Sequence, residues 1–122
     1  MINRKDTGTQ GELIAQNYLK NHGYHILENN FRSRFGEIDI IARQNDTLVF
    51  IEVRTKKSKS FGIPEESITT TKARHLIHTA YYYRQNHKKL PEKWRIDFLA
   101  IELDDNDKLL RINLIENAIE EE

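Results

Sequence analysis

Apolar residues recur along the 122-residue chain with two different periods, and these periods predict its helices and strands. Positions spaced three or four apart, such as Ala73, Ile77 and Ala80, indicate the apolar face of a helix. Short runs rich in Ile, Val and Phe, bounded by turn residues, indicate strands. The pattern predicts helices over residues 9–23 and 70–87, and strands over 24–27, 36–43, 48–56, 94–103 and 109–115.

The residues at the predicted helix starts support these boundaries. Thr9 and Glu12 have the spacing of a capping box, and hydroxyl side chains from Thr69 onward mark the second start. Gly23 is a typical C-terminal stop. We therefore expect residues 1–8 to form a flexible arm, and residues 116–122 to form an acidic tail.

The predicted order of elements is α-β-β-β-α-β-β, a three-stranded meander followed by a crossover helix. Hairpins join antiparallel strands, whereas a crossover helix returns the chain to a parallel neighbour. The order therefore predicts a single α/β domain over residues 1–122, with a mixed central sheet flanked by helices.

Composition narrows the class of protein. Hydrophobic residues make up 38% of the chain and charged residues 31%, which suits a soluble globular domain. The longest apolar run has about four residues, and the first residues include no apolar stretch, so we expect no membrane span or signal peptide. The absence of cysteine excludes disulfides, thiolate metal sites and a cysteine nucleophile. We expect a cytoplasmic protein with no membrane partner.

The zero net charge conceals two opposed blocks. Residues 1–53 carry a net charge of −1, residues 54–96 carry +8, and residues 97–122 carry −7. A basic middle segment favours an anionic partner, most plausibly nucleic acid. Neutralisation of one block by the other is the alternative, and charge alone leaves both open.

Two carboxylates interrupt the apolar strands of the central hairpin. If its turn is centred on residues 45 and 46, Asp39 lies opposite Glu52, and Glu37 lies opposite Arg54. Like charges in that position are destabilising, and a hard divalent cation such as Mg²⁺ would relieve them. The alternative is an ordinary solvated sheet face on which Glu37 pairs with Arg54.

The hairpin also resembles a known family. Asp39, twelve intervening residues, then Glu52-Val53-Arg54 is similar to the D…ExK signature of the PD-(D/E)xK nuclease superfamily. A wider set of motifs over residues 9–103 resembles the YraN-like family of small bacterial proteins, related to archaeal Holliday-junction resolvases. Those motifs are Gly11-Glu12-Leu13, Gly23-Tyr24, Asn30-Phe31-Arg32, Gly36-Glu37-Ile38-Asp39-Ile40-Ile41, Phe50-Ile51-Glu52-Val53-Arg54 and Arg95-Ile96-Asp97.

The resemblance implies a restriction-endonuclease-like αβββαβ core and a metal-dependent DNA endonuclease. Asp39 and Glu52 match the acids that bind Mg²⁺ or Mn²⁺, and Glu12 matches a helix-borne acid that often completes such sites. The chain has no zinc finger or recognition-helix motif that would read base edges, so we expect selection of DNA structure rather than sequence. Dimeric relatives also imply a homodimer.

Arg54 departs from the family signature, which has lysine at that position, and Ile38 stands where the superfamily name has proline. Arginine can grip a phosphate, but its pKa exceeds about 12, so it cannot act as a base. Lys56 lies on the same strand face and is a candidate substitute for the lysine. A nucleic-acid-binding module with a decayed nuclease site is therefore a second hypothesis, and a protein–protein adaptor is a third.

Several other residues allow two interpretations. Glu12 could serve the helix cap instead of the acidic site. The three tyrosines at residues 81–83 could stack on unpaired bases, although consecutive helical residues point about 100° apart, which favours core packing for some of them. Basic side chains around the hairpin and on the second helix are candidates for nucleic-acid contact, with a solvated basic surface as the alternative. They are Arg32, Arg34, Lys56, Lys57, Lys59, Lys72 and Arg74.

Overall fold

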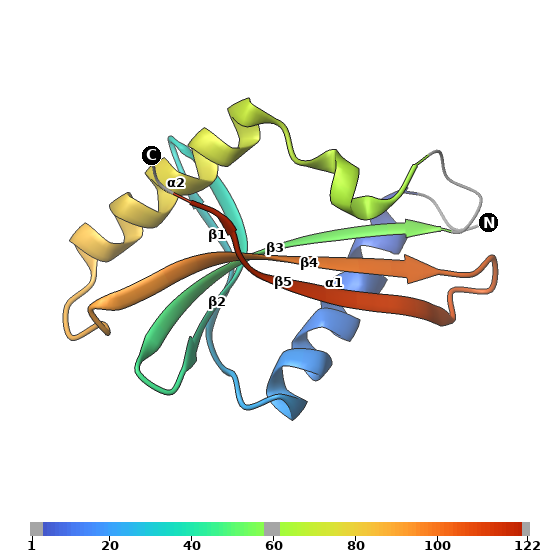
Figure 1. The fold of residues 1–122 in the computed structure, drawn as a ribbon, viewed down its shortest axis with the longest axis horizontal. Helices are drawn as coiled ribbons and strands as arrows, with labels where there is room; N and C mark the ends of the chain where they lie inside the picture. Colours follow the sequence, from blue (N-terminus) through green and yellow to red (C-terminus); the bar gives the residue numbers. More distant parts are fainter. Residues whose placement is uncertain (1–3, 58–61, 121–122) are drawn as a thin grey trace.

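The computed structural model describes residues 4–57 and 62–120, which form two helices, five strands and one 3₁₀ turn (Figure 1). The order of helices and strands is the predicted one. In chain order the elements are α1 (Arg4–Asn21), β1 (His25–Ser33), β2 (Gly36–Gln44), β3 (Thr47–Lys57), η1 (Pro64–Ser67), α2 (Thr70–Asn86), β4 (Lys93–Leu103) and β5 (Leu109–Ile119).

The five strands form one mixed sheet in the order β1-β2-β3-β4-β5. β3 and β4 are parallel, and every other neighbouring pair is antiparallel. The parallel pair exists because α2 carries the chain across the sheet between β3 and β4. This confirms the predicted fold class, α/β with a restriction-endonuclease-like αβββαβ core.

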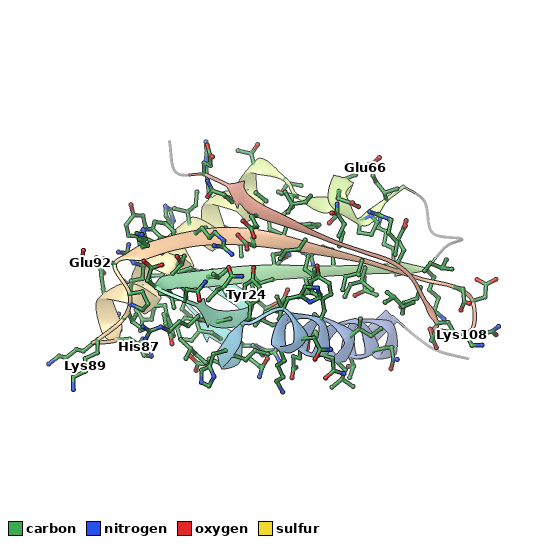
Figure 2. The ribbon with its side chains drawn as sticks, turned by 60° about the horizontal axis from the view of Figure 1, so that its bottom comes forward. Tyr24, Glu66, His87, Lys89, Glu92 and Lys108 are labelled. Atoms are coloured by element: carbon green, nitrogen blue, oxygen red, sulfur yellow. The ribbon has the colours of Figure 1, made fainter. Side chains whose placement is uncertain are left out.

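The two helices cover opposite faces of the sheet, as Figure 2 shows, with α1 on one side and α2 on the other. Alternation along β3 supplies both cores: Val49 and Ile51 pack toward α1, whereas Leu48 and Phe50 pack toward α2. Neither helix in the described ranges is long and apolar enough to cross a membrane.

The start of α1 differs from the prediction. The helix begins at Arg4, so Thr9 lies inside it and cannot be its N-cap, and residues 4–8 are not a flexible arm. Arg and Lys are well tolerated in helices, so nothing near residues 4 and 5 forces a later start. The helix is also held by the sheet: a Cβ added at Gly11 would lie 1.8 Å from Thr55 Oγ1, so only glycine permits this approach.

Both edge strands are longer than predicted. β1 continues to Ser33 through an irregularity near Leu27, and β5 continues to Ile119. An edge strand can carry polar side chains on its exposed face. Polar residues such as Asn29 therefore lack the apolar pattern from which a strand is predicted. Residues 116–119, expected in an acidic tail, belong to β5, while residues 1–3 and 121–122 lie outside the described residues.

Candidate active site

The candidate site lies where β2 and β3 stop pairing. The ladder runs from Gln44↔Thr47 to Ile40↔Ile51, which is the predicted register. Just beyond the last pair, the main-chain N–H of Val53 donates to Asp39 Oδ2 at 2.8 Å. A side-chain oxygen thus accepts the hydrogen bond in place of a main-chain carbonyl. Ile38 packs toward α2 and Ile40 toward α1, so the normal alternation of β2 is broken at Asp39.

Asp39 and Glu52 meet at this break and share a hydrogen bond between their carboxyl groups. Glu52 is buried, with 2% of its surface exposed. Burial, followed by the neighbouring charge of Glu52, raises the pKa of Asp39 to about 8. Burial also raises the pKa of Glu52, against the opposing effect of Arg54. At neutral pH the pair therefore retains a proton between two carboxylates.

Two cations approach the same oxygen of this pair. Arg54 Nη2 and Lys72 Nζ each lie 2.8 Å from Glu52 Oε2. Lys72 comes from the first turn of α2, where its N–H donates to the N-cap Thr69 at 3.1 Å. Among the described residues, Glu52 Oε2 makes these ion contacts but no hydrogen bond of regular geometry. The site thus combines two acids and two cations around the buried Glu52, while Asp39, Arg54 and Lys72 remain partly exposed.

This donor set fits a hard divalent cation. Mg²⁺ is commonly held by one or two carboxylates together with waters and substrate phosphates, and Asp39 and Glu52 supply the two carboxylates. Glu52 Oε2 already contacts two cations at 2.8 Å, so a divalent cation would share this carboxylate with Arg54 and Lys72 or displace one of them.

Glu12 does not complete a three-acid cluster. Its charge contributes to the raised pKa of Asp39, so the two are electrostatically coupled. However, no group of three or more His, Cys, Asp or Glu residues in the described part of the chain is close enough to hold a metal. The reason is topological: Glu12 projects from α1, whereas Glu52 points to the α2 face. The alternative role at a helix cap is also wrong, because Thr9 lies within the helix.

Glu37 does not pair with Arg54 as the hairpin register implied. Pairing of β2 with β3 ends at Ile40, so Glu37 lies opposite Arg32 of β1 instead. The Arg32 Nε to Glu37 Oε2 distance is 3.2 Å, and both side chains are largely exposed. Arg32 is therefore engaged at the β1–β2 end and not at the carboxylate pair.

The other predicted basic residues are dispersed. Lys57 forms an ion pair with Asp107 at 3.0 Å, at the β4–β5 end of the sheet. The Arg34 guanidinium lies 4.9 Å from the centre of the Phe35 ring. Lys56 is partly buried on β3, and Arg74 is exposed on α2. Lys59 lies outside the described residues. Lys72 is the member of this group whose ion pair reaches Glu52.

A second buried polar group lies on β4 and is structural. Asp97 is fully buried and accepts two hydrogen bonds from Arg95 Nε, at 3.0 and 3.1 Å, and one from the Asn117 N–H at 2.9 Å. Arg95 also donates to Tyr24 and Gln44. Both carboxylate oxygens of Asp97 thus accept hydrogen bonds from within the fold.

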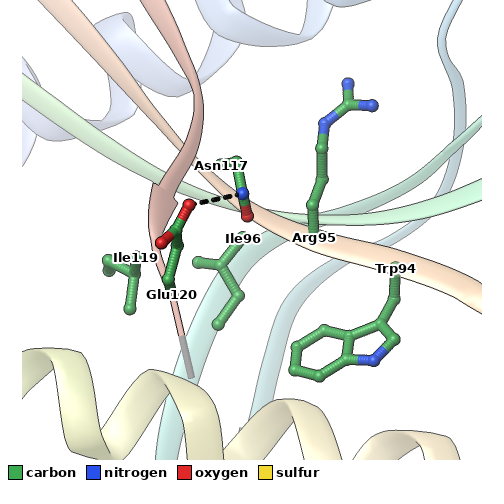
Figure 3. Close-up of a pocket in the computed structure, with 6 residues that line it drawn as sticks. All are labelled: Trp94, Arg95, Ile96, Asn117, Ile119 and Glu120. Atoms are coloured by element: carbon green, nitrogen blue, oxygen red, sulfur yellow. Dashed lines mark hydrogen bonds between the residues drawn. The ribbon is translucent and has the colours of Figure 1, made fainter. Parts of the chain in front are cut away.

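A hollow of about 320 Å³ opens beside this network, shown in Figure 3. Trp94 and Arg95 point to opposite sides of β4, and Asn117 Nδ2 donates to Glu120 across the opening at 2.9 Å. The hollow lacks a free acid pair, so it is not the candidate site.

The sequence motifs are matched by the profile of the uncharacterised protein family UPF0102, which covers residues 11–101. The chain belongs to the UPF0102 family. This is the YraN-like family that the motifs indicated, so that prediction is confirmed.

Similar UPF0102 proteins span nearly the whole chain. One from Caldicellulosiruptor saccharolyticus is 44% identical over 117 residues, covering 96% of this chain and 99% of that protein. One from Dehalococcoides mccartyi is 45% identical over 120 residues, covering 98% of each. A third, from Persephonella marina, is 51% identical over 94 residues, covering 77% of this chain and 81% of that protein.

Proposed function

We propose that this UPF0102 protein is a metal-dependent, structure-selective DNA endonuclease that hydrolyses phosphodiester bonds. The observation that carries the proposal is the meeting of half-buried Asp39 with buried Glu52, with Arg54 and Lys72 at 2.8 Å from Glu52. Two neighbouring carboxylates lower the stability of the fold unless a bound cation compensates their repulsion and desolvation. The side chains of Arg54 and Lys72 are suited to binding a phosphate group.

Asp39 and Glu52 would hold Mg²⁺ or Mn²⁺, and the negative charge of Glu12 would strengthen that attraction. When bound, such a cation polarises a phosphoryl oxygen and lowers the pKa of a bound water. Arg54 offers a planar fork of donors for the phosphate oxygens, so its role is to position the substrate and stabilise developing charge.

Lys72 is the proposed substitute for the lysine that the superfamily signature places where this chain has Arg54. Its ammonium group comes from α2 instead of β3, yet it reaches the same glutamate. Its contact with Glu52 is the reason to place it before Lys56 as the substitute.

Cleavage of a labelled substrate panel tests the proposal. The panel contains single-stranded, duplex, flap and four-way-junction DNA, each with Mg²⁺, Mn²⁺ or EDTA. Asp39→Asn and Glu52→Gln should each reduce cleavage at least 100-fold, since transition-state charge stabilisation is lost. Asp46→Asn is the matched control, because Asp46 is an exposed turn carboxylate that pairs with Lys93. Cleavage that survives EDTA or both site variants would refute a metal-dependent site at these acids.

A second function, nucleic-acid binding without cleavage, is favoured by one observation. Arg54 and Lys72 already neutralise Glu52, and the described residues provide no third acid at the pair. A binder predicts salt-dependent affinity in EDTA and no metal-dependent product in the same panel. The adaptor hypothesis predicts neither binding nor cleavage.

A further inference from the structure

A second hollow lies on the α2 side of the molecule, where the β1–β2 turn meets the exposed face of α2. Its volume is about 440 Å³, within the range of small-ligand pockets. It is lined by aromatic, cationic and amide side chains: Arg34, Phe35, His78, Tyr81, Tyr82, Gln85 and Asn86.

The aromatic rings of this pocket come from two different elements. Phe35, in the turn, lies 5.7 Å from the Tyr82 ring of α2 and 6.3 Å from the His78 ring. Tyr82 remains 37% exposed, whereas Tyr83 is buried and Tyr81 packs against Trp94. The three consecutive tyrosines therefore do not present their rings on one surface. Phe35 of the turn supplies the ring that pairs with Tyr82.

The turn that presents Phe35 is held in place. Ser33 Oγ accepts the Phe35 N–H at 3.1 Å and donates to the Gly36 carbonyl at 3.3 Å. Gly36 has φ of 144°, and a Cβ there would lie 3.2 Å from Thr79 Oγ1 and 3.3 Å from His75 Cβ. Only glycine therefore lets the turn pack this closely on α2, so the aromatic pocket is formed before any ligand binds.

Basic side chains lie both at this pocket and at the carboxylate pair. Arg34 places its guanidinium over Phe35, which gives a planar cation that can stack or contact phosphate. A smaller hollow of about 260 Å³ is lined by Gly36, which follows Phe35 in the chain, and by His75 and Lys72 of α2 among others. Lys72 thus borders this hollow and contacts Glu52.

We propose that the Phe35–Tyr82 pocket binds an unpaired nucleobase of the DNA that the carboxylate pair cuts. Aromatic faces stack on any base, the Gln85 and Asn86 amides can contact base edges, and Arg34 at the pocket can contact a phosphate. The identity of the ligand rests on the proposed function. It assigns the substrate class: DNA with an unpaired segment beside the scissile bond.

Binding measured with the metal chelated tests this pocket separately from cleavage. Fluorescence anisotropy compares the full chain on a labelled single-stranded oligonucleotide and on its fully paired duplex, both in EDTA. Tyr82→Ala should weaken single-strand binding about tenfold and change duplex binding less than twofold. Tyr82→Phe, which keeps the ring, is the matched control and should bind as the wild type does. In a Tyr82→Trp variant, the single strand should quench the new fluorescence.

The outcomes separate the two proposals. Selective single-strand loss in Tyr82→Ala supports the pocket even if no substrate is cleaved, in which case the nuclease proposal alone fails. Equal losses on both DNAs, no loss in Tyr82→Ala, or no single-strand binding by the wild type would overturn the pocket. Metal-dependent cleavage of the flap or four-way-junction DNA in any of those cases would leave the nuclease proposal standing alone.

Discussion

At the scale of single residues, the proton shared by Asp39 and Glu52 makes the free energy of unfolding depend on pH. Burial raises the pKa of both groups, so the folded pair binds a proton that the unfolded chain releases above about pH 4. Wherever the folded state binds more protons than the unfolded state, the free energy of unfolding falls as pH rises. The pair therefore destabilises the fold increasingly between about pH 4 and pH 8, and a cation that displaced the proton would reverse this.

Asp39→Asn should raise the free energy of unfolding at pH 7 by about 1–3 kcal/mol. The amide can donate to Glu52 and still accept the Val53 N–H, and the folded variant no longer has to take up a proton at residue 39 as the wild type does. Urea denaturation of wild type and variant at pH 5, 7 and 9 measures the difference, which should grow from pH 5 to pH 8. A difference that stays constant or shrinks over that range would contradict the raised pKa.

At the scale of elements, one arginine fastens η1 to the last two strands. Arg111 of β5 donates to both carboxylate oxygens of Glu65, at 2.6 and 2.8 Å, and to Glu102 of β4 at 2.6 Å. The hydrogen bonds from Arg111 lower the pKa of Glu65 to about 2. Because η1 leads directly into α2, this clamp helps to position the helix that carries Lys72.

Arg111→Met should lower the free energy of unfolding by about 1 kcal/mol near pH 7, since a bidentate pair is stronger than an ordinary surface pair. The lowered pKa of Glu65 means that its contribution is complete above about pH 4.5 and is lost as pH falls toward 2. Thermal melts at pH 7 and pH 3 should therefore show a smaller difference in acid. Lys93→Met is the control, because its pair with Asp46 is exposed on both sides. An equal loss in the two variants would contradict a clamp.

The elements also show what the sequence could predict. The hairpin register was predictable because a two-residue turn fixes it, and so was the opposition of Asp39 and Glu52. The end of the β2–β3 ladder was not predictable, since it depends on how the strands twist apart against the helices. For the same reason the Arg54–Glu37 pair was wrong, and the approach of Lys72 depended on the placement of α2. Glu12 as a metal ligand stays a prediction from the family resemblance.

At the scale of the whole molecule, the opposed charge blocks are partly neutralised within the fold. Lys57 of the basic block pairs with Asp107 of the acidic block, and Arg95 pairs with Asp97. Internal neutralisation, one of the two alternatives that the sequence left open, thus accounts for some of the pattern. Nucleic-acid binding remains a proposal that depends on the α2 side of the sheet, where Lys72 and Arg34 lie. The homodimer stays a prediction from the family resemblance.

The central claim is that Asp39 and Glu52 hold a divalent cation, and the rise in melting temperature with Mg²⁺ tests it most directly. A ligand that binds only the folded state stabilises it by about 1.4 kcal/mol at ten times its dissociation constant. Wild type and Asp46→Asn should therefore melt at higher temperature with Mg²⁺ than with NaCl of matched ionic strength. Asp39→Asn and Glu52→Gln, whatever their own stability, should lose that increment. An increment that persisted in both site variants would contradict the claim.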